Sequence, residues 1–84
     1  MEFTIDCSEI HDAKAFHNAL SQTLDFPDWY GHNLDALYDC LTELPEPAHL
    51  ILKNWDSATP FATGFESVFA DAQADNPDFT MEYR

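Results

Sequence analysis

The stretch His49-Leu50-Ile51-Leu52-Lys53-Asn54-Trp55 lies just past the middle of the chain. It contains a short apolar run with a β-branched residue at its centre, which is typical of a strand buried on both faces. Strands of this kind lie in the interior of parallel sheets, because helices there cover both faces. We therefore predict a central strand within residues 49–55 and expect the other elements to be arranged around it.

Two further strands are predicted near the ends of the chain. Residues 2–7 and 79–84 both alternate between apolar and polar side chains, which is the period-two pattern of a half-buried strand. Cys7 closes the first of these patterns on its apolar side. With the central stretch, the chain is thus expected to form three strands.

Helices are predicted between the strands. Asp12 and Asn33 are suitable N-cap residues ahead of apolar positions spaced by three and four, and Pro60 precedes a third such pattern that runs to about Ala74. His17 falls on the apolar side of the first helix and is expected in the core. Strands linked through helices form parallel sheets with right-handed crossovers. The expected fold is α/β, with one domain over residues 1–84 and a three-stranded parallel sheet in the order 1-2-3 packed with about three to four helices.

The charge of the chain restricts its partners. Sixteen acidic residues stand against three basic ones, for a net charge of −13. Such a field repels nucleic acids and anionic membranes and attracts basic macromolecules. The first residues lack the basic and apolar regions of a signal peptide, and Cys7 and Cys40 are too few for a disulfide framework. We expect reduced thiols and a cytoplasmic protein with no cofactor and no bound metal.

The predicted helix over residues 33–43 separates its side chains by type. Leucines gather on one side of it, and three acids spaced by four residues gather on another. Each like-charged pair at that spacing costs the free helix about 0.2–0.5 kcal/mol, and no lysine or arginine is spaced to offset it. A loop with two adjacent aromatics, Trp29 and Tyr30, precedes the helix. Aromatic anchors beside charged groups are typical of protein interfaces. The acids are Asp35, Asp39 and Glu43, with Tyr38 and Thr42 at the border of the leucine side.

Residues 26–41 resemble the barstar family of intracellular inhibitors of barnase-type ribonucleases. The resemblance rests on a long pattern, Phe26-Pro27-Asp28-Trp29-Tyr30-Gly31-His32-Asn33-Leu34-Asp35-Ala36-Leu37-Tyr38-Asp39-Cys40-Leu41. It extends to the order of the elements along the whole chain, with residues 45–65 the least similar part. Three positions depart from the family pattern, namely Trp29, Tyr38 and Glu43, so the matching nuclease does not follow from the resemblance.

The resemblance implies a binding mode. Proteins of this family insert the helix and its preceding loop into the active site of the nuclease, in what we expect to be a 1:1 complex. A carboxylate at the position of Asp39 takes the place of a substrate phosphate, and an acid of the last helix corresponds to Asp71. The implied partner is a basic ribonuclease or a ribonuclease toxin domain, for which this chain would be the immunity protein. The implied contact residues are Trp29, Tyr30, Gly31, Asn33, Asp35, Tyr38, Asp39, Thr42, Glu43 and Asp71.

Two alternatives come from the residues themselves. Asp35, Asp39 and His32 could together hold a divalent metal for phosphoryl chemistry, but no nucleophile motif, glycine-rich loop or zinc-like histidine spacing accompanies them. Catalysis is therefore not expected. The second alternative is an acidic binding module that regulates a basic partner other than a nuclease, and its sequence would look much the same.

Overall fold

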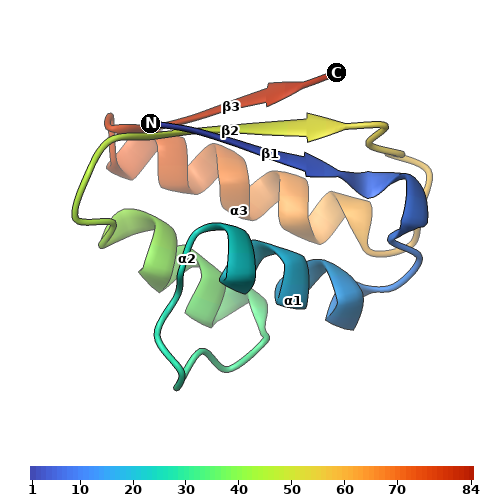
Figure 1. Cartoon of the computed structure of the whole chain (residues 1–84), viewed down its shortest axis with the longest axis horizontal. Helices are drawn as coiled ribbons and strands as arrows, with labels where there is room; N and C mark the ends of the chain where they lie inside the picture. Colours follow the sequence, from blue (N-terminus) through green and yellow to red (C-terminus); the bar gives the residue numbers. More distant parts are fainter.

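The computed structural model describes all residues, 1–84, and forms a three-layer arrangement of short elements (Figure 1). Strand β1 spans Glu2–Asp6 and is followed by a 3-10 helix, η1, over Cys7–Glu9. Three α-helices and two further strands follow. Their bounds are α1 Ala13–Thr23, α2 Leu34–Thr42, β2 Ala48–Lys53, α3 Ala62–Asp75 and β3 Phe79–Tyr83.

The sheet has the order β1-β2-β3, and both strand pairs are parallel. Leu50 of β2 lies between Phe3 of β1 and Met81 of β3 in the register. The predicted α/β class, the strand order and the central place of β2 are confirmed. Three α-helices accompany the sheet, at the lower end of the predicted three to four.

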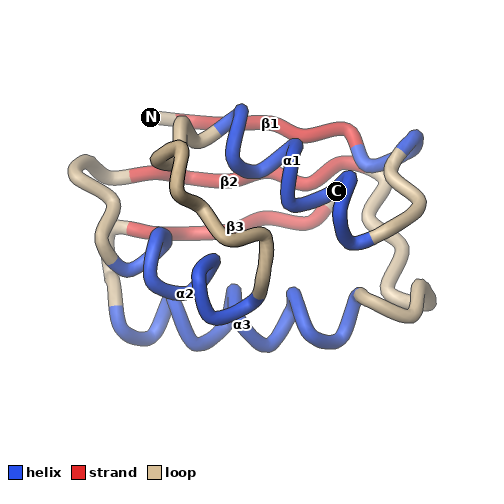
Figure 2. Tube along the Cα trace, turned by 90° about the horizontal axis from the view of Figure 1, so that it is seen from below, coloured by secondary structure: helices blue, strands red, loops and turns tan.

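All three α-helices lie on one side of the sheet (Figure 1). Helix α1 runs beneath β1 and α3 beneath β3, while α2 packs against α3 on the side away from the strands (Figures 1 and 2). The core fills the space between these layers, with Phe16, Leu50, Phe65 and Phe69 among its fully buried side chains. Because α2 packs mainly against α3, its opposite side, with Asp35, Asp39 and Glu43, faces solvent.

The other side of the sheet carries no helix. On this open face the alternate residues Glu2, Thr4 and Asp6 of β1 lie opposite alternate residues of β2 in the register, and these in turn lie opposite Thr80 and Glu82 of β3. Ile51 is nonetheless buried, with 3% of its surface exposed, between Thr4 and Glu82 in the register. The prediction of a strand buried on both faces therefore holds for Leu50, Ile51 and Leu52, although side chains rather than a helix cover the second face.

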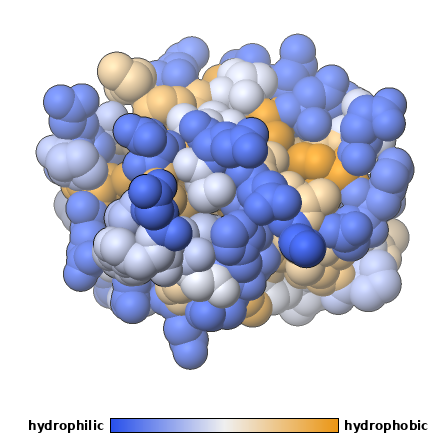
Figure 3. Space-filling view, turned by 60° about the horizontal axis from the view of Figure 1, so that its bottom comes forward, coloured by the Kyte–Doolittle hydropathy of each residue, from blue (hydrophilic) through white to orange (hydrophobic).

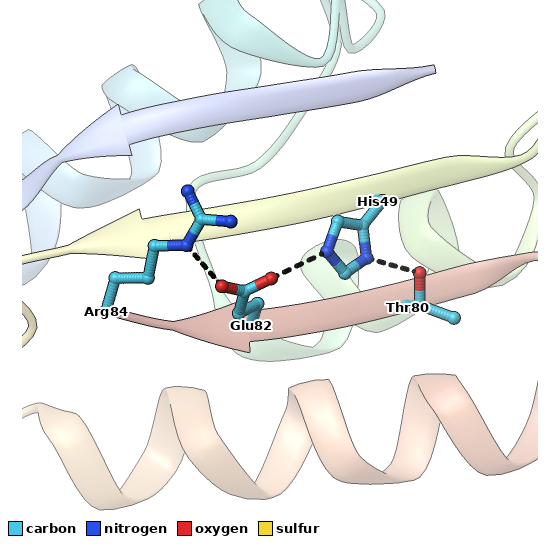
Figure 4. A network of polar contacts seen from close by, with 4 residues as sticks. All are labelled: His49, Thr80, Glu82 and Arg84. Carbon is cyan, nitrogen blue, oxygen red and sulfur yellow. Dashed lines mark hydrogen bonds and ion pairs between the residues drawn. The ribbon is translucent and has the colours of Figure 1, made fainter.

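Polar contacts on this open face join β2 to β3 (Figure 4). His49 contacts the hydroxyl of Thr80 at 2.7 Å and the carboxylate of Glu82 at 3.3 Å, and Arg84 donates to the same carboxylate. The contacts of His49 and Arg84 with Glu82 are the two ion pairs of the chain.

Three of the differences between the predicted and observed element boundaries have a local cause. Strand β1 ends at Asp6 and Cys7 is not a strand residue, because the Asp6 carboxylate accepts a hydrogen bond from the Ser8 amide and starts η1. Strand β2 ends at Lys53 rather than Trp55, because Asn54 adopts a left-handed conformation with φ 58°. Helix α3 begins at Ala62, since a turn between Thr59 and Ala62 follows the predicted start at Pro60.

Candidate protein-binding surface

Helix α2 begins where its sequence predicts. The Asn33 side chain accepts a hydrogen bond from the Ala36 amide at 2.8 Å and caps the first turn. Leu37, Cys40 and Leu41 form the buried side of the helix, whereas Leu34 is 36% exposed. Cys40 is thus part of the core, and both cysteines are buried and free, as expected.

The acids Asp35, Asp39 and Glu43, called the acidic row below, all lie on the exposed side of α2. No hydrogen bond or ion pair satisfies the three carboxylates within the chain, because the ion pairs and side-chain hydrogen bonds involve other residues. Three like charges at four-residue spacing destabilise the free helix. The row is therefore hydrated and available to a partner.

Neighbouring aromatics of the loop before α2 have opposite environments. Trp29 is 69% exposed, whereas Tyr30 is 5% exposed and belongs to the core cluster. The exposure of Trp29 fits a contact residue. Tyr30 was predicted on the contact surface, but its side chain points inward and is not presented to solvent in the free protein.

The Tyr30 side chain fastens the loop to α1. Its hydroxyl lies 2.5 Å from Nδ1 of His17, which is buried as predicted for a core histidine. Burial lowers the pKa of His17, with a smaller effect from His32, and burial raises the pKa of Tyr30. Both groups are thus favoured in their neutral forms, and the pair makes an uncharged buried hydrogen bond.

His32 makes a second connection between the loop and α1. Its Nδ1 lies 3.1 Å from the Tyr30 carbonyl oxygen and its Nε2 lies 2.8 Å from Oδ1 of Asn18. The residue is exposed and left-handed, with φ 51°. These contacts occupy both ring nitrogens of His32, which is a loop residue as expected.

Gly31 leaves room for the helix cap. A Cβ at this position would approach Nδ2 of Asn33 to 2.9 Å, a distance that side chains essentially never accept. The same Nδ2 donates to the Gly31 carbonyl at 3.3 Å. Gly31 and Asn33 were both predicted as contact residues, and in the free protein they take part in the turn and cap that begin α2.

Helix α3 adds acids to the border of the acidic row. The Tyr38 hydroxyl donates to the Asp75 carboxylate, and this hydrogen bond raises the pKa of Tyr38, with smaller effects from burial and from the charges of Asp75, Asp71 and Asp39. Asp71 is therefore near Tyr38 and on the same side of the molecule as the row. Asp75 was not predicted as a site residue, although it follows Asp71 by four positions and so shares its side of the helix.

Thr42 is tied to its own helix. Its hydroxyl donates to the Tyr38 carbonyl at 2.9 Å, and the residue is half-buried. At the same end of α2, Asn76 donates to the Leu41 carbonyl at 2.9 Å and joins the helix to the residue after α3. The end of α2 is therefore tied to the residue that follows α3.

Seen from the side of α1 and α2, the molecule is covered largely by hydrophilic residues, with apolar surface visible between them (Figure 3). No three histidine, cysteine or acidic side chains gather closely enough to hold a metal ion. None of the helices has the length and apolar character needed to cross a membrane.

Fold and surface together define a class of small, acidic α/β proteins in which an outlying helix carries unpaired carboxylates beside an exposed aromatic. The chain belongs to the Barstar (barnase inhibitor) family, whose model matches residues 1–84.

A protein of Bacillus subtilis (strain 168) named "Putative ribonuclease inhibitor YrdF" is 45% identical to this chain over 58 residues. The aligned region covers 68% of the chain and 64% of that relative, so the chain matches just under two thirds of the relative's length.

Proposed function

We propose that this chain inhibits a basic ribonuclease of the barnase type by covering its active site with α2 and the loop that precedes it. One observation carries the proposal: a member of the Barstar family exposes three carboxylates on α2 that nothing in the chain neutralises. Ribonucleases bind a polyanion and therefore have a cationic cleft. The acidic row provides the complementary charge.

Asp39 has the central role in this proposal. It is the middle member of the acidic row, with Asp35 and Glu43 four residues to either side. A carboxylate among the cations of the nuclease cleft takes the place of the substrate phosphate. Asp35, Glu43, Asp71 and Asp75 then surround that contact with further negative charge.

In the loop before α2, the exposed residue contacts the partner and the buried residue positions the loop. Trp29, which is largely exposed, is the aromatic anchor next to the acidic row, while Tyr30 holds the loop in position through His17. A preformed loop loses less conformational entropy on binding than a mobile one. Gly31 and Asn33 contribute through the backbone and the helix cap.

The proposal places the protein in the cytoplasm of a cell that makes such a nuclease, in a 1:1 complex with it. The nuclease could be secreted or could be the toxin domain of a competition system, for which this chain is the immunity protein. Two free, buried cysteines are consistent with a reducing compartment. No catalytic activity is proposed.

Inhibition of barnase tests the proposal. Cleavage of a fluorogenic RNA substrate should stop when the chain is added in equimolar amount. Inorganic phosphate should slow the association more than chloride at equal ionic strength, because phosphate competes for the site that Asp39 takes. Undiminished cleavage by barnase would exclude barnase as the partner, and undiminished cleavage by every member of a panel of barnase-type ribonucleases would contradict the proposal. Binding without loss of cleavage would favour an acidic module for a basic partner of another kind.

A further inference from the structure

An apolar groove of about 510 Å³ opens beside the acidic row, at the end of α2. Its walls come from the end of α1, residues 25–27 with Trp29, the last turn of α2, residues 44–47 and the residues at the start of β1 and β2. This volume lies in the range of sites that enclose a small organic group. The acidic row does not account for the groove, because the groove is lined mainly by apolar side chains.

The walls of the groove are apolar and firmly built. Leu24 and Phe26 line it while being buried by the rest of the fold, and Phe3 and Leu44 pack against the core behind them. Water held against such walls gains little from polar contacts. An apolar group that displaces this water would be stabilised.

Acids surround the apolar walls. Asp25, Glu43 and Glu46 line the groove and are exposed, and no lysine or arginine lines it. The one cation among the lining residues is the N-terminal ammonium of Met1, which donates to the Pro47 carbonyl at 3.3 Å. The carboxylates of the three acids accept no hydrogen bond from any side chain of the protein and take part in neither ion pair. The rim therefore favours a partner's apolar side chain that is flanked by positive charges, and it disfavours an apolar side chain that is flanked by the partner's own carboxylates.

The groove is continuous with the proposed contact surface. Trp29 and Glu43 belong to both, and Cys40, next to Asp39 in sequence, lies in the groove wall. Helix α2 is only about 13 Å long for its nine residues. A standard interface buries about 800 Å² on each partner, a patch some 30 Å across. A partner centred on Asp39 therefore extends over the groove.

We propose that the groove is a second recognition site for the same basic partner and receives an apolar side chain flanked by lysine or arginine. This inference rests on the proposed function and adds a determinant of which nuclease is bound. Nucleases share cationic clefts because they share a substrate. The acidic row alone therefore gives only a small difference in affinity between one nuclease and another. A side chain at the border of the cleft differs between nucleases and can be selected by shape.

Filling the groove tests the proposal. Thr23 lines the groove at the last residue of α1, whereas its neighbour Gln22 is exposed and does not line it. With barnase as the probe, Thr23→Tyr should raise Kd about tenfold or more, the effect of losing one well-packed anchor. Gln22→Tyr, the matched control, should stay within about twofold of the unmodified chain. Equal affinities of the two variants would overturn the proposal.

Two charge-reversal variants, one at the rim of the groove and one away from it, test the rim independently. Glu46→Lys alters the rim, and Glu9→Lys makes the same change of net charge on η1, away from the groove. Both variants weaken the general attraction to a basic partner. Glu46→Lys should raise the Kd for barnase at least about threefold more than Glu9→Lys, because only the former also removes a local contact. Identical effects would show that Glu46 acts only through net charge and would contradict the rim contact.

A peptide titration separates failure of the groove from failure of the proposed function. The probe acetyl-Lys-Phe-Lys-amide should shift the NMR signals of Leu24, Phe26 and Leu44 in the unmodified chain but not in Thr23→Tyr. Acetyl-Glu-Phe-Glu-amide should shift none of them. If the chain inhibits no ribonuclease of the barnase type, the proposed function is wrong while this titration still decides the groove. Equal shifts with both peptides, or none with either, would overturn the proposed occupant.

Discussion

Carboxylates on two sides of the molecule have opposite environments. On the open face of the sheet, Glu82 accepts hydrogen bonds from Arg84 and His49, and these contacts lower its pKa (Figure 4). On α2, the acidic row has no such partner. Carboxylates that hold a fold together are paired within it, whereas the row only repels itself. Glu82 thus contributes to contacts within the sheet, and the unpaired row is consistent with the proposal that it contacts a partner.

Other acids of the chain resemble Glu82. Glu66 accepts hydrogen bonds from Trp55 and Ser57, and Asp6 accepts one from Asn54, which with the Ser8 contacts lowers the Asp6 pKa to about 2. Each of these carboxylates joins two elements or closes a turn. Other exposed acids, such as Asp25 and Glu46, also lack a partner, so the row on α2 is distinguished by its regular four-residue spacing on one helix rather than by being unpaired.

The largest expected effect comes from Asp39→Ala. Removing one member of a buried ion pair costs about 3–5 kcal/mol, so the Kd for barnase should rise by two to four orders of magnitude. The free protein should be as stable as before or more so, because two like-charged contacts vanish and alanine is a better helix former by up to about 0.7 kcal/mol. Titration calorimetry and thermal unfolding at low salt measure the two effects. Lower stability would place Asp39 with Glu82 among the structural acids.

Trp29→Ala should come next. Truncating an aromatic anchor typically costs about 2 kcal/mol of binding, or roughly 30-fold in Kd. Thermal stability should change little, since the side chain is mostly in solvent. Tyr30→Ala is the matched comparison and should destabilise the fold by about 3–5 kcal/mol, as core aromatics do. Similar melting temperatures for the two variants would remove the distinction between the neighbouring aromatics.

A smaller effect is expected from pH on the free energy of unfolding. Burial lowers the pKa of His17 in the folded state below its ordinary value of 6.5, so the unfolded chain binds a proton more readily. The stability contributed by neutral His17 is present above about pH 6.5 and falls as the pH drops below it, by at most about 1.4 kcal/mol per pH unit.

Urea unfolding between pH 5 and pH 7 measures this slope. His17→Gln should flatten it and the exposed His11→Gln should leave it unchanged. The acid Asp6 does not interfere, because its lowered pKa affects stability only below about pH 4. A slope that survives in His17→Gln would assign the dependence to another group.

The smallest effect is expected from Glu82→Gln. Ion pairs on an open surface contribute little, so the melting temperature should fall slightly and the Kd for barnase should not change beyond the loss of one negative charge. Glu9→Gln supplies the same charge change without the ion pairs. A marked loss of binding in Glu82→Gln alone would show that the open sheet face also takes part in recognition.

Much of the fold could be predicted from local pattern. The alternation in β1 and β3, the apolar run of β2 and the caps Asp12 and Asn33 each reflect an interaction between residues close in sequence. The errors at Cys7 and Trp55 have a common cause. In both cases a turn ends the strand before its apolar pattern ends, through the Asp6 carboxylate in one case and the left-handed Asn54 in the other.

The candidate site could be predicted only in part. The acidic row and the exposure of Trp29 follow from helical spacing and loop composition. The inward direction of Tyr30 does not, because it depends on His17, a residue thirteen positions earlier in a different element. The groove was also beyond prediction, since its walls come from segments spread between Met1 and Ala48. Both features arise from tertiary packing.

The three-stranded sheet has a further consequence for the behaviour of the protein in concentrated solution. β1 and β3 each have one edge with no neighbouring strand, and such edges can pair with those of another copy. Mutual repulsion at a net charge of −13 keeps the copies apart. Near the isoelectric point of about 4.1 this repulsion disappears while the edges remain, so acidification should make the protein aggregate through its own strands.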